Sequence, residues 1–292
     1  MPSIPFTMTC GLLLLLFPSP GRGAGPPLDL EGTFQQGGMV VGYTAPGTEV
    51  LFQGRPLRVS DSGAFLFGFG RDAPSSAVLT LIGPFGERIS RRLEVRARRY
   101  RVQRINGLPG RLVTPRPGDL ARILLERTML RRARNHDSPL TGFLGPFRWP
   151  VKGRITSAYG SRRILNGQPR RPHLGVDIAA PPGTPVRAPA PGRVRLAAEG
   201  LYFSGETLVI DHGHGLASSY MHLERILVRE GEYVRRGQII ARVGATGRVT
   251  GPHLDWRVTL FGCHLDPELV AGPPPPADPE GSPGSEAAPR TP

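Results

Sequence analysis

Two short stretches of the sequence carry side chains that could bind a metal ion. In the first, His173 and Asp177 lie four positions apart, and in the second, His253 and Asp255 lie two positions apart. Histidine nitrogens and carboxylate oxygens are common ligands of zinc and related ions. The two stretches therefore predict a metal site built without cysteine.

Strand geometry indicates how these groups would meet. In an extended strand, residues two apart face the same side at roughly 7 Å, so His253 and Asp255 can address one small site. In a straight strand, His173 and Asp177 would be roughly 13 Å apart, and sharing an ion requires a bend, which Gly175 between them permits. One nitrogen and two carboxylates leave the fourth position of a tetrahedral zinc open to water. That arrangement is typical of a catalytic site, where the ion acidifies water and polarises a carbonyl.

The elements that must position these groups are predicted to be mostly β-strands. The chain has 292 residues, which favours two globular units with irregular flanking segments over one domain. Its 39 glycines and 33 prolines disfavour long helices and favour short strands joined by turns.

The charge balance predicts an anionic partner. The net charge is +14, and most of it comes from arginine. A nucleic acid, an acidic cell-wall polymer and a membrane surface are the candidate classes. The arginines are spread along the chain and accompany no nucleic-acid-binding motif, so no nucleic acid partner is expected. Cys10 lies in an apolar leader, which leaves Cys263 as a lone thiol, expected to be a small buried residue.

The first residues resemble a secretory signal, assigned to residues 1–25. An apolar run over Leu12–Phe17 is followed by prolines and a small-residue stretch, although no Lys or Arg precedes the run. The run is too short to span a bilayer, and Cys10 stands before it, which does not support a lipid anchor. Secretion to the periplasm without stable membrane insertion is the expectation.

Four further segments follow. Residues 28–97 show short alternating runs with glycine turns, which predict a small antiparallel β-sandwich of immunoglobulin-like type. Residues 98–146 form a linker with one helix near 120–134, for which Asp119 is the predicted N-cap. Residues 147–270 form a second, antiparallel β domain, and residues 271–292 form a proline-rich tail predicted to be disordered.

Five strands are predicted in the second domain, two of them joined by a hairpin at Gly213–Gly215. Their ranges are 192–197, 206–211, 216–222, 238–243 and 254–259. His212 and His214, at the hairpin, are expected to be polar loop residues. The arginine pairs 162–163 and 170–171 border the metal-binding stretch, where they either hold substrate carboxylates or are solvated loop charges.

A set of motifs over about residues 150–267 occurs together in one order. Its positions are Arg162–Arg163, Asn166–Gly167, His173–Val186, Ala188–Pro189, Gly192–Val194, Tyr220–Leu223, Gly231, Val234, Gly237–Gln238, Ile240, Gly244, Thr246–Gly247 and Gly251–Leu254. In these positions the sequence is similar to the lysostaphin-type zinc endopeptidases of bacterial cell walls, the M23 family. The resemblance implies a compact antiparallel β fold with a groove, bound Zn²⁺, and cleavage of peptide bonds in peptidoglycan.

The resemblance also implies a role for each site residue. His173 and Asp177 match the first two zinc ligands, and His222 and His253 match two catalytic histidines that polarise water and stabilise the oxyanion. The sequence departs from the family at Asp255, where a third ligand histidine is usual. A carboxylate can also bind zinc, but the added negative charge would weaken the Lewis acid or shift its metal preference.

Two alternatives stay open from the residues alone. Asp255 could pair with an arginine such as Arg257 or Arg193, and His222, on a strand beside Tyr220, could be a hydrogen-bonded core histidine.

Three functions are weighed. The first is a zinc-dependent metalloendopeptidase, a hydrolase that cleaves peptidoglycan crosslinks in cell-wall remodelling. The alternative is a weak or inactive relative that activates another wall hydrolase. The third is a wall-binding protein that acts through the N-terminal sandwich. Peptidoglycan is the expected partner, together with a divisome protein or another wall hydrolase.

Overall fold

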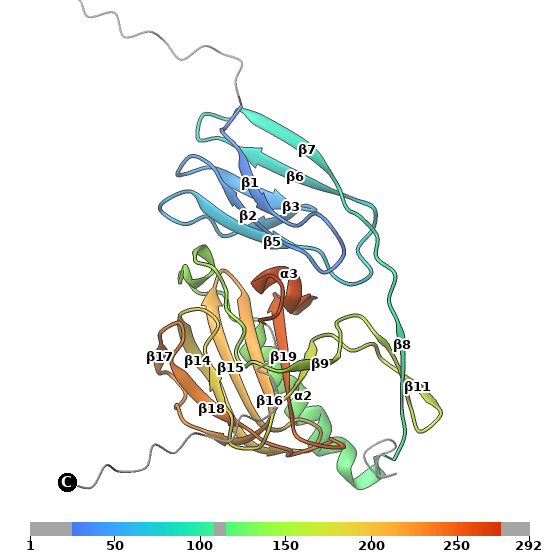
Figure 1. Ribbon diagram of the computed structural model, residues 1–292. Coiled ribbons are helices and arrows are strands. Elements are labelled where there is room, and N and C mark those ends of the chain that lie inside the picture. Colours follow the sequence, from blue (N-terminus) through green and yellow to red (C-terminus); the bar gives the residue numbers. More distant parts are fainter. Residues whose placement is uncertain (1–24, 108–114, 276–292) are drawn as a thin grey trace, which may run out of the picture.

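The computed structural model describes residues 25–107 and 115–275 (Figure 1). All but the last residue of the predicted signal segment, and residues 276–292 of the predicted tail, lie outside the described residues. Within the described part the chain is mostly β, as predicted, with its strands gathered into an N-terminal and a C-terminal unit.

The N-terminal unit consists of two antiparallel sheets. One sheet has the order β1-β2-β5 and the other the order β4-β3-β6-β7. Phenylalanines at alternate positions, Phe65, Phe67 and Phe69, fill its core. The two sheets agree with the predicted sandwich, and its immunoglobulin-like type stays a prediction. The strands are β1 (Asp29–Gly32), β2 (Met39–Tyr43), β3 (Glu49–Phe52), β4 (Arg55–Leu57), β5 (Ala64–Gly68), β6 (Ser76–Ile82) and β7 (Arg88–Glu94).

The connection between the units carries one long helix, α2 (Leu120–Arg134), which begins and ends where the sequence predicts. Asp119 is the N-cap residue, as predicted, but its side chain makes no capping hydrogen bond and instead accepts a hydrogen bond from Tyr202 Oη at 3.1 Å. The other elements here are β8 (Val102–Ile105), η1 (Pro117–Asp119) and η2 (Gly142–Leu144).

The C-terminal unit is a ten-stranded sheet whose central path is β17-β14-β15-β16-β19-β12-β9. Beside it, β8 and the hairpin β10–β11 form a small separate sheet. The elements are β9 (Arg154–Ser157), β10 (Arg162–Leu165), β11 (Gln168–Arg170), β12 (Val176–Ala179), β13 (Pro185–Arg187), β14 (Gly192–Leu201), β15 (Gly205–Gly213), β16 (Leu216–Ile226), β17 (Tyr233–Val234), β18 (Ile239–Val243), β19 (His253–Leu260), β20 (Cys263–Leu265) and α3 (Pro267–Ala271).

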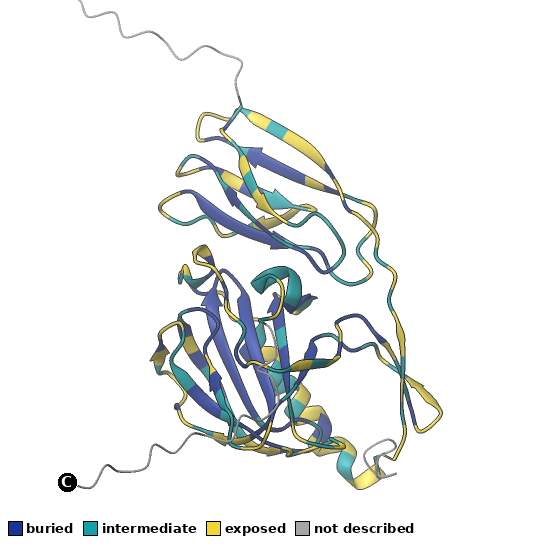
Figure 2. Cartoon of the chain, in the orientation of Figure 1, coloured by how far each residue is buried: buried dark blue, intermediate teal, exposed yellow. Residues whose placement is uncertain are grey.

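The central strands of this sheet bury both of their faces (Figure 2). One face, termed the core face, contributes Tyr220 and Trp256 to the main apolar cluster. The opposite face, termed the groove face, is partly covered by α2, whose Leu130 and Ala133 pack on Val209. The strands are therefore covered on both sides, one side by apolar core and the other in part by a helix.

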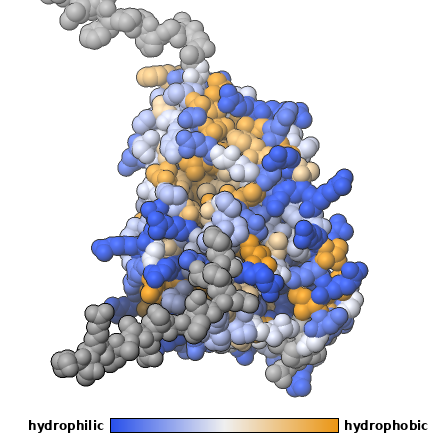
Figure 3. Space-filling model, in the orientation of Figure 1, coloured by the Kyte–Doolittle hydropathy of each residue, from blue (hydrophilic) through white to orange (hydrophobic). Residues whose placement is uncertain are grey.

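The two units are in contact near α3, which lies between them in Figure 1. Asp266, just before α3, receives a hydrogen bond from Arg98 at 2.6 Å, and its backbone N–H donates to the carbonyl of Gly37 at 2.8 Å. On the face drawn in Figure 3, hydrophobic side chains gather over the N-terminal sandwich and hydrophilic ones project from both flanks.

The hairpin histidines differ from expectation. His212 and His214 are 0% and 2% exposed, because the segment from Ser138 to Phe147 covers the turn. The expectation of polar loop residues is wrong for both. Among residues 25–107 and 115–275, no helix is long and apolar enough to cross a membrane.

Candidate metal centre

Strand pairing brings two of the predicted ligands face to face. Asp177 on β12 is directly opposite Asp255 on β19. Their neighbours Ile178, Leu254 and Trp256 point into the core, so both carboxylates point to the groove face. The period of two in each strand therefore places both acids at one point.

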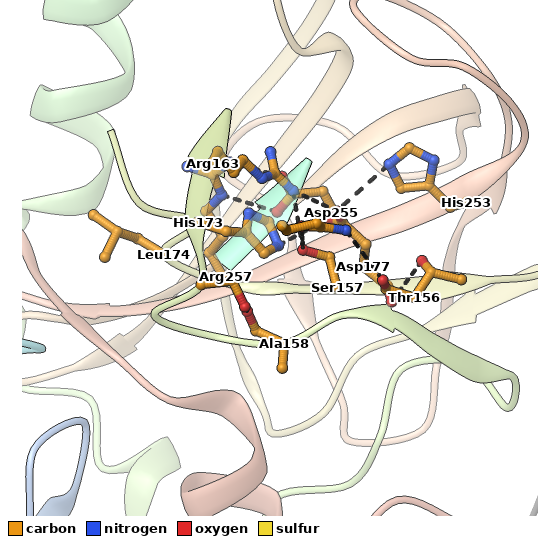
Figure 4. A network of polar contacts seen from close by, with 12 residues as sticks. Thr156, Ser157, Ala158, Arg163, His173, Leu174, Asp177, His253, Asp255 and Arg257 are labelled. Carbon is orange, nitrogen blue, oxygen red and sulfur yellow. Dashed lines mark hydrogen bonds and ion pairs between the residues drawn. The ribbon is translucent and has the colours of Figure 1, made fainter. Parts of the chain in front are cut away.

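His173 joins them from the loop that leads into β12. Its backbone is held by hydrogen bonds with Gly160 and Ser161, and its Nε2 lies 3.0 Å from Asp177 Oδ1 (Figure 4). Gly175 allows this approach for a reason beyond bending. A Cβ at Gly175 would lie 2.5 Å from the side chain of Arg257 and 2.6 Å from the carbonyl oxygen of Trp256.

The three predicted ligands have the composition and spacing of a cation site. One ligand atom from each of His173, Asp177 and Asp255 lies within 4.8 Å of the other two, and all three residues are buried. His173 Nδ1 has no hydrogen-bond partner among the described residues, and the 3.0 Å contact of His173 Nε2 with Asp177 Oδ1 does not have the geometry of a hydrogen bond. Unpaired buried polar atoms are costly, and a divalent cation bound among them would satisfy them. One nitrogen and two carboxylate oxygens suit zinc.

Each carboxylate also contacts its own arginine. Arg163 on β10 donates from Nη2 to Asp177 Oδ2 at 2.6 Å, and Arg257 donates to both oxygens of Asp255, at 2.8 and 2.6 Å. Arg193 instead bonds the carbonyl of Gly231. Arg257 is thus the arginine partner of Asp255. Because each carboxylate oxygen has two lone pairs, the pair with Arg257 leaves acceptor sites for a metal.

These contacts set the protonation of the acids. Burial alone would raise the pKa of Asp255, but Arg257 outweighs it and holds that pKa well below the usual value. Burial would likewise raise the pKa of Asp177, but His173 and Arg163 more than offset it. Burial lowers the pKa of His173. The three groups are therefore held in the forms that bind cations, two carboxylates and a neutral imidazole.

His222 reaches the same site through an irregularity of β16. Regular alternation would place it on the core face with Tyr220, but its φ is +62°, and the strand shifts register nearby, between Glu206 and Leu208 of its partner. His222 therefore faces the groove and lines two cavities that also contain Asp255. His222 is buried and hydrogen-bonded, but it does not lie on the core face with Tyr220.

Both predicted catalytic histidines present the same ring nitrogen. His222 Nδ1 lies 2.8 Å from the carbonyl of Thr246, and His253 Nδ1 lies 2.9 Å from that of Gly251. Because a carbonyl can only accept, each Nδ1 carries the proton and each Nε2 keeps its lone pair when the ring is neutral. Burial lowers the pKa of His222 to about 4, which keeps it neutral. The two rings are 4.9 Å apart, and His253 Nε2 lies 4.0 Å from Asp177 Oδ1.

The structure thus brings together all five predicted site residues: His173, Asp177, His222, His253 and Asp255. Two arginines complete the site: Arg257 pairs with Asp255, which confirms an alternative left open by the sequence, and Arg163 differs from expectation. Arg163 was predicted to be a substrate-binding or solvated residue and instead holds Asp177. The position of Arg257, two residues after Asp255 on one strand, was a usable signal for their pairing.

Comparison with known proteins identifies relatives of this chain. The family model described as peptidase family M23 matches residues 171–267. A Pseudomonas aeruginosa protein whose crystal structure is described as a peptidase M23 aligns with a TM-score of 0.65 and 30% identity. The alignment covers 82% of this chain and 96% of that one.

Two curated relatives each match less than half of the chain. The peptidoglycan DD-endopeptidase ShyC of Vibrio cholerae is 40% identical over 119 residues, which is 40% of this chain and 27% of that protein. The DD-carboxypeptidase/endopeptidase Mpg of Neisseria meningitidis is 42% identical over 126 residues, which is 43% of this chain and 29% of that protein. The chain thus spans under a third of the length of these relatives.

Proposed function

The chain belongs to peptidase family M23, and from that membership and the geometry of the site we propose that it is a zinc-dependent endopeptidase that hydrolyses peptide crosslinks of peptidoglycan. The observation that carries the proposal is the buried group of His173, Asp177 and Asp255, which lies beside two histidines whose Nδ1 atoms each contact a backbone carbonyl. The names of the curated relatives supply the substrate class.

In this proposal His173, Asp177 and Asp255 hold the ion. Bound zinc would lower the pKa of a water molecule and polarise the scissile carbonyl. Two carboxylates in place of one add negative charge, but Arg163 and Arg257 each contribute a compensating positive charge at hydrogen-bond distance. Because Arg257 offsets its charge, the aspartate at position 255 lowers the net charge around the ion by less than one full negative charge.

The histidines move and hold protons. With its pKa at about 4, His222 is neutral at pH 7, and its free Nε2 can accept a proton from the attacking water. His253, with Nδ1 fixed on Gly251, turns its Nε2 toward the ligand group. Once either ring is protonated, it can donate a hydrogen bond to the oxygen that becomes negative as the bond is attacked.

The site of action follows from the substrate. Peptidoglycan lies outside the cytoplasmic membrane, so we place the protein in the periplasm, with residues 1–25 as its export signal. A divisome protein or another wall hydrolase is the partner class proposed for it. The basic composition, net charge +14, suits a protein that acts on an acidic polymer.

A second function is favoured by one contact. Arg257 engages both oxygens of Asp255, which competes with metal for that carboxylate. If that pair excludes the ion, the chain is an inactive relative that activates another wall hydrolase.

Metal content and hydrolysis separate the two functions. The protein, purified without chelator, is expected to contain about one zinc per chain, counted by mass spectrometry, and to release peptides from purified sacculi. His222→Ala and His253→Ala are each expected to lower the rate by about 10²- to 10⁴-fold, the range for a lost general acid–base group, with zinc retained. His136→Ala, at an exposed histidine outside the site, is the matched control. A metal-free, inert protein that nevertheless stimulates another hydrolase would favour the activator.

A further inference from the structure

A cavity of about 190 Å³ opens beside the metal centre, between α2 and the groove face of the sheet. His222 and Asp255 line its inner end, and Phe203 and Arg248 line it from the loops. The cavity is therefore continuous with the place where the proposed reaction occurs, and any group bound in it would lie next to the scissile bond.

Helix α2 supplies the opposite wall. Residues 123, 126, 127, 130 and 134 all line the cavity, and their spacing of three and four identifies them as one face of the helix. This wall is fixed in place by packing of Ala133 on the sheet and by a 2.9 Å hydrogen bond from the backbone of Tyr202 to Glu126 Oε2. α2 thus narrows the groove on this side of the metal ligands, and it brings Arg127 and Arg134 to the cavity.

The charges around the cavity do not balance. Arg134 donates from Nε to Ser219 Oγ at 2.9 Å, and within the described ranges no carboxylate lies within 4 Å of its guanidinium. Arg127 forms no ion pair with any residue that the structure describes. The one acid from the helix wall, Glu126, accepts from Arg122 at 2.7 Å. Asp255 is already paired with Arg257.

The arginines also affect one another. Burial, then repulsion from Arg257, lowers the pKa of Arg134 to about 10. Burial, then repulsion from Arg163 and Arg257, lowers the pKa of Arg248 to about 10. Guanidinium groups that repel one another create a positive potential in the cavity, and an anion bound between them would reduce the repulsion.

We propose that this cavity is a subsite for a carboxylate on the substrate residue that follows the scissile bond. The inference rests on the proposed function. The residue that contributes the scissile carbonyl has no free α-carboxylate, because that group forms the bond. An α-carboxylate on a residue that flanks the scissile bond must therefore belong to the residue that supplies the amine. Guanidinium groups bind carboxylates through paired hydrogen bonds, and the small volume suits a short residue.

The test uses two peptides, acetyl-D-alanyl-D-alanine and its C-terminal carboxamide. The zinc-loaded full chain is expected to cleave the acid with a kcat/KM at least about tenfold higher, the factor expected from a charged hydrogen bond. In Arg134→Gln and Arg127→Gln the preference is expected to fall toward about twofold, mainly through KM, with unchanged zinc content and melting temperature. Arg132→Gln, exposed on α2 outside the cavity, is the matched control.

A binding experiment separates failure of the subsite from failure of the proposed function. The same zinc-loaded protein is titrated with D-alanine and with D-alaninamide and followed by ligand-observed NMR. Selective binding of D-alanine that Arg134→Gln abolishes supports the subsite, even if no peptide is cleaved and the proposed function fails. Equal cleavage of acid and amide overturns the subsite and leaves the proposed function standing. Equal binding of both ligands overturns the subsite whether or not the peptides are cleaved.

Discussion

The core face and the groove face of β19 differ although they alternate along one strand. Leu254 and Trp256 on the core face are fully buried among apolar side chains. Asp255 and Arg257, interleaved with them, form a buried ion pair on the groove face. Burial of Leu254 and Trp256 stabilises the fold, whereas burial of the charged pair costs desolvation free energy that only good geometry and a further ligand can offset.

Alternation of side chains allows one strand to serve two purposes. Because successive side chains point to opposite faces, the apolar residues can hold the strand in place while their neighbours keep an arrangement that is not stable by itself. His222 extends the same principle to β16. Its neighbour Tyr220 anchors the strand in the core, and the irregularity at φ +62° transfers His222 to the groove face.

Removal of Arg257 from the groove face should destabilise the protein more than any other change considered below. Arg257→Ala leaves the carboxylate of Asp255 buried without its partner and is expected to lower the free energy of unfolding of the metal-free protein by about 4 kcal/mol. At saturating zinc the loss is expected to be smaller, because the ion compensates the same carboxylate. Urea denaturation with and without zinc measures both values.

Two variants test that explanation. Arg225→Ala, at an exposed arginine of β16, should change stability by less than about 0.5 kcal/mol. The double variant Asp255→Ala/Arg257→Ala should be more stable than Arg257→Ala alone, since no unpaired charge remains. The fall in the free energy of unfolding could instead be the same in the double variant as in Arg257→Ala, or the same at every zinc concentration. Either result would show that Arg257 stabilises the protein by packing and not through its charge.

The sequence predicts one part of this comparison well. The alternation of residues 253–258 is enough by itself to place His253 and Asp255 on one side of a strand, and the helical spacing of 120–134 locates α2. These signals are local, since they depend on the period of the element itself. The glycine at position 175 is also visible in the sequence, but the close approach of Arg257 and Trp256 that leaves no room for a side chain there is a tertiary contact.

Other features depend on long-range packing and have no local signal. The rotation of His222 depends on pairing with β15 and on a 2.9 Å hydrogen bond to the carbonyl of Ser204. The burial of His212 depends on Phe147, far away in the sequence. Which side of the sheet α2 covers is decided by its contacts with Leu196, Val209 and Ala217.

The core face provides the second test. Leu254→Ala removes a fully buried side chain next to Asp255 and is expected to lower the free energy of unfolding by about 3 kcal/mol through lost burial and a cavity. Zinc stoichiometry and affinity of the folded protein should stay unchanged, because the groove face keeps its side chains. Calorimetric zinc titration measures this, and a large fall in zinc affinity would show that the two faces are not independent.

The smallest of these effects on stability comes from the buried imidazole of His212, on the core face. His212 Nδ1 donates to the carbonyl of Pro191 at 2.8 Å, and Nε2 accepts from Ser218 Oγ at 2.7 Å, which requires a neutral ring. Burial lowers the pKa of His212 to about 4, below its unfolded value near 6.5, so its contribution to stability is present above pH 6.5 and is lost as the pH falls toward 4.

As the pH falls from 7 to 5, this histidine alone should reduce the free energy of unfolding by about 2 kcal/mol, because His212 binds a proton in the unfolded chain but not in the folded chain. His212→Gln cannot titrate, so its stability should fall less over the same interval, by about that difference, as measured by urea denaturation at each pH. Parallel pH curves for the two proteins would mean that His212 is protonated in the folded state. The core face would then tolerate a buried charge much as the groove face does.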